Sequence, residues 1–460
     1  MNECLRSVGL DVGTTTTQLI LSELQIQNVA GGFSVPQMQI MERKILYRSP
    51  VYFTPLLGEN RVDGAAIRRI VEAEYEKAGV RKEMLHTGAV IITGETSRKE
   101  NARTVLENLS EFAGDLVVAT AGPHLESVLA AKGAEAVKFS RETGKTVLHM
   151  DIGGGTSNLA LIEDGKITAT GCMNVGGRLL KLDPRGKITY VSPVLQGITD
   201  LSVGQTVTRQ QVEKLAQLLV QALEMAAGLT PQTDLLQRFW TQEAGSAFVL
   251  CPEGNAVLSF SGGVADCIRE DVPWLQFGDI GPCLGQAIRK SRLCAGQYRL
   301  GSQTIRATVI GAGCHSAQLS GSTVFYRNVR FPIKDLSAVP LSLQEQNLPH
   351  PALVKTIRSR MEACDQAAVL ALPGVCAPDY GAVQRLAQAI AQALAGRPAY
   401  IALEQDMAKA LGQALALLLP EGAPCLCIDG VALEEGSFLN VASPVGPAVP
   451  VVIKTLILGG

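Results

Sequence analysis

The same short pattern occurs twice in this chain, over residues 11–17 and again over residues 151–158. In each copy an apolar run ends in an aspartate, Asp11 or Asp151, and glycines and threonines follow before a second apolar run begins. Two apolar runs joined by a short Gly/Thr turn predict an antiparallel pair of strands. The sequence therefore predicts two strand pairs far apart in the chain, each with an acid beside its turn.

The residue types in both turns suit the binding of phosphate. Glycine lets backbone N–H groups approach phosphate oxygens because no Cβ stands in the way, and threonine hydroxyls donate to the same oxygens. Neither turn ends in the Gly-Lys-Ser/Thr of a Walker loop, and neither leads from a strand into a helix as a dinucleotide fingerprint does. The candidate phosphate-binding residues are Gly13, Thr14, Thr15, Thr16, Gly153, Gly154, Gly155, Thr156 and Ser157.

The two aspartates have a different expected role. A carboxylate repels phosphate, but it can hold Mg²⁺, usually through the waters of the ion, and it can orient an attacking water. We therefore expect Asp11 and Asp151 to be the catalytic and metal-binding pair. The alternative is that each aspartate only caps its own turn.

Two further glycine motifs follow. An expected strand runs into Gly262 and Gly263, and a later run of small residues contains Gly311 and Gly313. The order of these motifs resembles the superfamily of actin, sugar kinases and the seventy-kilodalton heat-shock chaperones. The resemblance implies an α/β fold, a two-lobed actin-like ATPase whose ribonuclease H-like lobes enclose a nucleotide cleft, followed by a C-terminal α/β segment. The resemblance places adenosine against the turn at Gly262 and Gly263. It also implies that the segment with Gly311 and Gly313 lets a helix cross closely at the hinge between the lobes, and it counts these two glycines among the nucleotide-binding residues.

A narrower resemblance covers nearly the whole chain, from about residue 6 to the C-terminus. The chain resembles the reactivating factors of ethanolamine ammonia-lyase over residues 91–96, 101–103, 121–127, 174–178, 279–282 and 450–456. The resemblance implies an ATP-dependent molecular chaperone, with ATP and Mg²⁺ as cofactors, whose partner is the lyase with its cobalamin. Such a factor releases damaged cobalamin so that intact adenosylcobalamin can enter. A cytoplasmic location is expected from the odd number of cysteines without an export signal, and association with the ethanolamine-utilisation microcompartment stays open.

Glu95 is the third candidate catalytic acid. It follows the apolar run 89–92, and in related folds a loop at that point reaches the γ-phosphate region. The alternative is that Glu95 has no catalytic role and lies at the N-terminus of a helix, where the positive end of the helix macrodipole stabilises its negative charge. Arg178 follows a Gly-Gly pair and could face phosphate or pair with an acid. His149, within the apolar run before Asp151, is expected in the core.

Two other functions stay open at this point, and a third is disfavoured. A small-molecule kinase would need an acidic base beside the substrate hydroxyl, and the sequence offers no acid for it beyond Asp11, Asp151 and Glu95. A nucleotide-dependent filament protein would polymerise cooperatively, a property that no sequence feature displays. An iron–sulfur activator of acyl-CoA dehydratases would need paired cysteines across a dimer, whereas Cys267 and Cys283 are isolated in the sequence.

The composition argues against several partners. A formal net charge of −2 and an aromatic content of 5% disfavour nucleic acid, because basic faces and stacking side chains are scarce. No run reaches the ~18 apolar residues of a membrane helix. Residues 1–6 lead directly into the first expected strand, so we expect no signal peptide. The 11 cysteines include no Cys-x-x-Cys pair and are expected to be free thiols in a reducing cytosol.

Hydrophobic patterning divides the chain into three expected parts. Residues 1–145 form the first lobe, with 34–60 as a mobile or inserted region bounded by prolines. Residues 146–335 form the second lobe, which carries the second phosphate turn and the adenosine motif. Residues 336–460 form a C-terminal α/β segment that is the candidate partner-contact region, entered through a proline-rich linker over 336–351.

Overall fold

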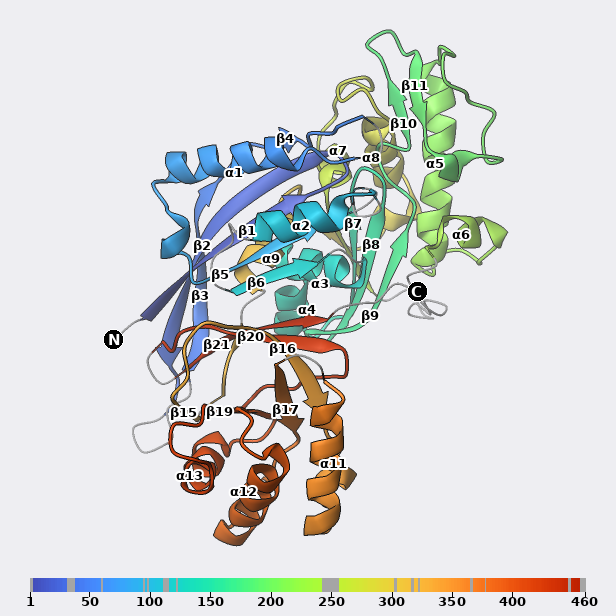
Figure 1. Cartoon of the computed structure of the whole chain (residues 1–460). Coiled ribbons are helices and arrows are strands. Elements are labelled where there is room, and N and C mark those ends of the chain that lie inside the picture. The colour runs from blue at the N-terminus through green and yellow to red at the C-terminus, as the bar shows by residue number, and fades with distance from the viewer. Residues whose placement is uncertain are drawn as a thin grey trace.

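The computed structural model contains three large β-sheets and a two-stranded ribbon, with helices packed on the sheets (Figure 1). Within the described part of the chain, no helix is both long and apolar enough to cross a membrane. The structure describes residues 3–30, 38–58, 61–93, 96, 99–110, 116–120, 123–241, 256–301, 304–315, 318–321, 323–364, 367–376, 378–445 and 448–455.

The first lobe is built on a mixed sheet with helices on both faces. Its elements are β1 (Glu3–Val12), β2 (Thr16–Asn28), β3 (Met38–Arg48), β4 (Tyr52–Phe53), α1 (Gly64–Ala78), η1 (Lys82–Met84), β5 (Thr87–Ile92), α2 (Ala102–Ser110) and β6 (Leu116–Thr120), together with α3 (Pro123–Gly133) and α9 (Ala307–His315). The strand order is β3-β2-β1-β5-β6, and β4 pairs with β2. Strand β5 is buried along its whole length because Val90 and Ile92 pack towards α1 and α2, whereas Ala89 and Ile91 pack towards α3 and α9.

The second lobe repeats the sheet of the first. Its elements are α4 (Ala136–Thr143), β7 (Val147–Ile152), β8 (Ser157–Glu163), β9 (Lys166–Met173), β10 (Leu180–Leu182), β11 (Ile188–Val191), η3 (Pro193–Leu195), α5 (Arg209–Ala226), α6 (Asp234–Phe239), β12 (Val257–Ser261), α7 (Gly263–Arg269), α8 (Gly281–Arg289), η5 (Arg292–Cys294) and β13 (Tyr298–Leu300). The strand order β9-β8-β7-β12-β13 matches that of the first lobe. In both sheets three antiparallel strands are followed by two parallel ones. This duplication confirms the two-lobed, actin-like α/β fold that the sequence predicted.

Helices α3 and α9 cross between the lobes with almost no space between their backbones. A Cβ on Gly133 would lie 1.8 Å from the carbonyl oxygen of Ala307, and a Cβ on Gly311 would lie 2.0 Å from that of Leu129. Only glycine permits such an approach. The close helix crossing expected near Gly311 is therefore present.

A third unit carries an eight-stranded sheet. Its elements are β14 (Gln318–Leu319), β15 (Val324–Arg327), β16 (Ile333–Pro340), α10 (Leu343–Gln346), α11 (His350–Glu362), β17 (Ala368–Leu372), α12 (Tyr380–Leu394), β18 (Ala399–Leu403), α13 (Ala408–Leu418), β19 (Cys425–Ile428), β20 (Ser437–Val441) and β21 (Pro450–Thr455). Strands β16 to β19 are parallel, and α11, α12 and α13 cover one face of the sheet (Figure 1). Near β20 and β21, Ala442 and Val452 pack in one cluster with Leu129 and Ala312, so this unit rests on the first lobe.

Two sequence expectations about the boundaries need correction. The linker expected over 336–351 is wrong, because β16 begins at Ile333 and pairs with β17 and β20 inside the third sheet. Since β14 and β15 belong to that sheet too, we propose that the C-terminal unit begins near residue 318 rather than at 336. The described part of the region 34–60 is not an insert, because β3 continues the first sheet from β2. Its charged residues suit an exposed edge strand, which hid the strand signal.

Candidate nucleotide site

A cavity of about 440 Å³ lies between the two lobes. A volume of this size suits a small-molecule ligand. The cavity brings together both aspartates and both Gly/Thr turns, as the sequence predicted. Its lining includes Asp11, Gly13, Thr14, Thr15, Thr16 and Thr93 from the first lobe, and Asp151, Gly153, Gly154, Gly155, Thr156, Arg178, Gly262 and Gly263 from the second.

The two Gly/Thr turns have equivalent geometry. The N–H of Gly13 donates to the carbonyl of Thr16 at 2.8 Å, and the N–H of Gly153 donates to the carbonyl of Thr156 at 2.9 Å. In each lobe the turn therefore closes the hairpin between the first and second strands. The sequence repeat corresponds to a structural one, and the two turns face each other across the cavity.

Asp11 is held at the end of β1 in a buried position. One carboxylate oxygen accepts a hydrogen bond from the Thr93 hydroxyl at 3.0 Å. Burial raises the pKa of Asp11 to about 7; the Thr93 hydrogen bond opposes this rise and the nearby charge of Asp151 adds to it. The two carboxylates repel each other when both are charged, and a bound cation would offset this repulsion.

Asp151 occupies the matching position on β7. Its carboxylate accepts hydrogen bonds from the Ser261 hydroxyl and, at 3.2 Å, from the Thr308 hydroxyl. Burial raises the pKa of Asp151, and these two hydrogen bonds oppose the rise. Behind Ser261 lies His149, whose ring nitrogens are 3.1 Å from Ser259 Oγ and 3.0 Å from Ser261 Oγ. His149 is a core residue, as predicted, and it also supports the hydroxyl that orients Asp151.

Three buried polar atoms near the turns have no hydrogen-bond partner among the residues that the structure describes. They are the hydroxyl oxygen of Thr15, Oε1 of Gln18 and Oδ1 of Asn158. Gln18 lies directly opposite Asp11 in the β1–β2 pair, so both side chains point to the same face of the sheet. Its Nε2 donates to the carbonyl of Ile305 at 3.0 Å, which fixes Oε1 as the acceptor. Orphaned donors and acceptors of this kind suit a phosphate and an ordered water.

The donor set also fits Mg²⁺. Among the described residues, no three or more His, Cys, Asp and Glu side chains gather into a metal cluster. Magnesium nonetheless binds proteins through one or two carboxylates and takes its other ligands from water and nucleotide phosphates. Asp11 and Asp151 supply such a pair at the wall of the cavity.

Comparison with known proteins then decides the family. Residues 3–459 match the family described as "Ethanolamine utilisation protein EutA". The chain belongs to this EutA family.

Two relatives of this EutA family member extend over nearly its whole length. It is 36% identical over 473 aligned residues to the ethanolamine ammonia-lyase reactivase EutA of Salmonella typhimurium strain LT2, with 98% of each chain covered. It is 37% identical over 469 aligned residues to the protein of the same name from Escherichia coli strain K12, again with 98% of each chain covered. Among solved structures, ethanolamine utilization protein EutJ from Carboxydothermus hydrogenoformans is 16% identical, with a TM-score of 0.33 over 67% of this chain and 88% of that one.

Several predicted site residues of this EutA family member lie elsewhere. The Ser157 hydroxyl donates to the carbonyl of Val175 at 2.7 Å inside the second lobe, and Ser157 does not line the cavity. Gly311 and Gly313 also lie outside the lining, because they pack α9 closely against α3 and β1. Their small size permits this close packing. Glu95 lies outside the described residues.

Other residues of the site were not predicted. Thr93, Ser261 and Thr308 donate hydrogen bonds to the two aspartates, a role that the sequence did not predict. Their positions in the sequence could have indicated them, because each lies in or beside a motif already noted. Gln18 could have been found from the hairpin register, which places it opposite Asp11.

Arg178 forms an ion pair with Asp279. Its Nε lies 3.3 Å from a carboxylate oxygen of Asp279, and both side chains are mostly buried. The other Asp279 oxygen accepts from the N–H of Gly281 at the start of α8, at 2.9 Å. Burial raises the pKa of Asp279, whereas the Gly281 N–H and Arg178 oppose the rise. Arg178 therefore pairs with an acid, yet it also lines the cavity.

Proposed function

We propose that this EutA family member is a Mg²⁺-dependent ATPase that acts as a molecular chaperone of ethanolamine ammonia-lyase. The observation that carries the proposal is the meeting of two equivalent Gly/Thr turns across one cavity, each with its own buried aspartate. The two relatives that cover 98% of the chain are named as reactivases of that lyase, which supports the lyase as the partner.

In this proposal the chemistry follows from the residues of the two turns. Backbone N–H groups and threonine hydroxyls bind the phosphates, and the adenosine lies against Gly262 and Gly263. Asp11 and Asp151 would hold Mg²⁺, which would supply positive charge to offset the negative charge of the phosphates. Gln18 accepts a hydrogen bond from the attacking water through Oε1, the acceptor that has no described partner.

Hydrolysis drives a cycle of partner binding. The protein binds lyase that carries damaged cobalamin and opens its cofactor site, so that the damaged cobalamin leaves. ATP binding or hydrolysis then releases the protein, and intact adenosylcobalamin enters. Such a cycle needs only a protein whose affinity for the lyase differs between nucleotide states. The hinge of α3 and α9, where backbones touch at Gly133 and Gly311, is the element that links the lobes in this cycle.

The third unit is the lyase-contact surface in this proposal, and the family's place in ethanolamine utilisation supports a location beside the lyase in the cytoplasm. Deleting the unit would not test this, because Ala442 and Val452 cover apolar residues of the first lobe. Substitutions of Tyr380 and Leu417 are better, since these side chains are 79% and 85% exposed on α12 and α13. Tyr380→Ser with Leu417→Ser should weaken lyase binding and leave nucleotide binding unchanged; equal lyase binding contradicts this part of the proposal.

ATP hydrolysis is tested by measuring phosphate release from the wild type and from Asp151→Asn. Asparagine keeps the shape of the side chain but removes its charge, so turnover should fall roughly 100-fold with the fold intact. Unchanged turnover removes Asp151 from the mechanism. Phosphate transfer to a small hydroxyl compound, without any effect on the lyase, would favour the small-molecule kinase instead.

A further inference from the structure

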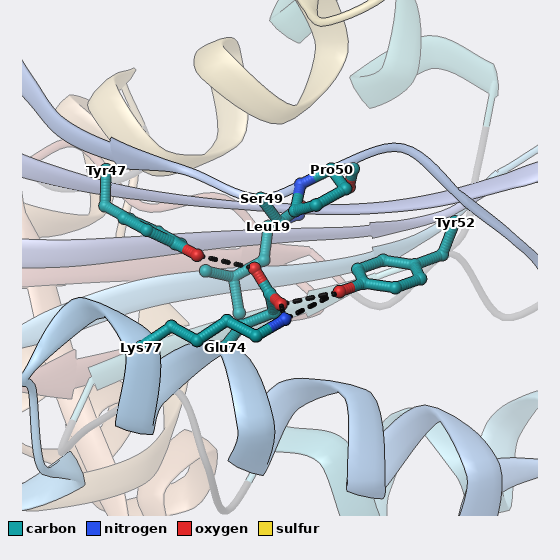
Figure 2. Close-up of polar contacts among 7 residues, drawn as sticks. All are labelled: Leu19, Tyr47, Ser49, Pro50, Tyr52, Glu74 and Lys77. Carbon is teal, nitrogen blue, oxygen red and sulfur yellow. Dashed lines mark hydrogen bonds and ion pairs between the residues drawn. The ribbon is translucent and has the colours of Figure 1, made fainter.

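The segment after β3 is fastened to the first phosphate turn and to α1. Figure 2 shows that the Tyr52 hydroxyl donates to the buried carboxylate of Glu74 on α1, at 2.6 Å. The N–H of Thr54 donates to the carbonyl of Thr15 at 2.9 Å, and its hydroxyl donates to the carbonyl of Gly13 at 2.7 Å. Phe53, between Tyr52 and Thr54, is therefore held in a fixed relation to the first turn.

Arg178 is fastened to the second phosphate turn in a comparable way. Its N–H donates to the carbonyl of Gly154 at 2.6 Å, and the N–H of Gly177 donates to that of Gly153 at 3.0 Å. The ion pair with Asp279 orients its side chain through Nε alone. Arg178 therefore moves with the second turn, as Phe53 moves with the first.

These two residues meet across the mouth of the cleft. The guanidinium carbon of Arg178 lies 5.7 Å from the centre of the Phe53 ring, within the range of a cation–π contact. The Phe53 side chain is otherwise open to solvent, with 75% of its surface exposed. The contact thus links the two phosphate turns through side chains, and it depends on where the guanidinium lies.

The terminal amino groups of Arg178 are placed to take an anion. Among the described residues, they make no hydrogen bond or ion pair, because only Nε contacts Asp279. Arg178 is also the only Lys or Arg among the described residues that line the cavity, whereas Asp11, Asp151, Asp266 and Asp279 all line it. Among the described lining residues, a polyphosphate in so acidic a cavity has this one cation available, and guanidinium binds phosphate through paired N–H donors.

We propose that Arg178 binds the terminal phosphate of the nucleotide through its Nη groups and that its contact with Phe53 makes closure of the lobes depend on that phosphate. This inference rests on the proposed nucleotide binding. With ATP, the phosphate fixes the guanidinium under the Phe53 ring and holds the turns together. With ADP, the guanidinium loses that anion and the contact across the cleft weakens. Asp279 is a positioning residue that holds Nε and leaves Nη free for phosphate.

The first test compares the dissociation constants of ATP and ADP for the whole protein, with and without Arg178. Arg178→Gln should reduce the preference for ATP over ADP by roughly 10- to 100-fold, as expected for a lost charged hydrogen bond. Arg178→Lys keeps one charge without the planar fork and should lose part of the preference. Arg299→Gln is the matched control, because Arg299 makes an equivalent contact with Phe139, 4.6 Å from the ring, away from the cleft.

The second test separates phosphate binding from closure. Phe53→Ala should keep the ATP preference but lose the decrease in radius of gyration that ATP causes in small-angle X-ray scattering. An unaltered ATP preference in folded Arg178→Gln and Arg178→Lys overturns the phosphate contact, and normal compaction of Phe53→Ala overturns the bridge. Wild-type protein that binds neither nucleotide contradicts the proposed function itself, a different outcome from either of these.

Discussion

Gly154 of the second phosphate turn lies directly against Thr15 of the first. A Cβ on Gly154 would lie 2.6 Å from the Thr15 hydroxyl oxygen, closer than side-chain atoms approach one another. The two lobes are thus in contact through the parts of the chain that we assign to phosphate, and that contact leaves no room for a methyl group.

Gly154→Ala should therefore push the turns apart and weaken nucleotide binding by roughly tenfold or more, which is about 1.4 kcal/mol. The fold should survive because the strain is confined to the interlobe contact. Calorimetric titration with ATP measures the effect. Gly296→Ala is the control, since a Cβ at Gly296 would meet no atom within 4 Å. Wild-type affinity in Gly154→Ala would mean that the turns do not close on the phosphates in this arrangement.

Gln18→Leu should slow ATP hydrolysis far more than it weakens ATP binding. The substitution keeps the approximate volume of the side chain but removes Oε1, the acceptor assigned to the attacking water. Loss of one such positioned group costs roughly 10- to 1,000-fold in turnover. Single-turnover hydrolysis and equilibrium binding, measured on the same variant, distinguish the two effects. An equal loss in both would assign Gln18 to packing alone.

Asp11 predicts how stability depends on pH in the metal-free protein. Because burial raises its pKa from 3.8 to about 7, the folded state holds a proton that the unfolded state has released at intermediate pH. This group therefore lowers stability as pH rises from about 4 to about 7. Asp11→Asn lacks the effect, so its Tm should rise relative to that of the wild type between pH 5 and pH 8. A Tm difference that is constant across this range contradicts a raised pKa. Adding Mg²⁺ with nucleotide should stabilise the wild type most at pH 8.

The hydrogen bonds of Glu74 to Tyr47 and Tyr52 predict how stability depends on pH (Figure 2). Its buried carboxylate accepts from Tyr47, Tyr52 and Lys77 at 2.8, 2.6 and 2.7 Å. Burial alone would raise its pKa, but these hydrogen bonds lower it below 4.5. The stabilisation is present above that value and lost as pH falls through the folded pKa. Glu74→Gln should cost roughly 2 kcal/mol at pH 7 and less at pH 4, as measured by urea unfolding. Equal costs at the two values would contradict this.

Much of the fold could be predicted because its signals are local. The apolar runs that became β5 and β7 are buried throughout, and the repeated acid and Gly/Thr turn marked the start of each lobe. Strands β3 and β16 were missed because one is a charged edge strand and the other ends at Pro340. Both owe their place to neighbouring strands rather than to their own residues.

The site divides in the same way. The places of Asp11 and Asp151 were predictable because each directly follows an apolar run and precedes a Gly/Thr turn in the sequence. The ion pair of Arg178 with Asp279 was not, since it joins residues that only the tertiary fold brings together. The role of Gly311 also depends on a partner, the backbone of Leu129, that no local pattern indicates.

Reactivation of the lyase tests the central claim most directly. Ethanolamine ammonia-lyase inactivated by bound cyanocobalamin is mixed with this protein, ATP, Mg²⁺ and free adenosylcobalamin, and acetaldehyde is followed over time. We predict that activity returns with ATP and the wild-type protein, and that it does not return without ATP or with Asp11→Asn. An inactive lyase in the complete mixture, despite measurable ATP hydrolysis by the wild type, would contradict the account.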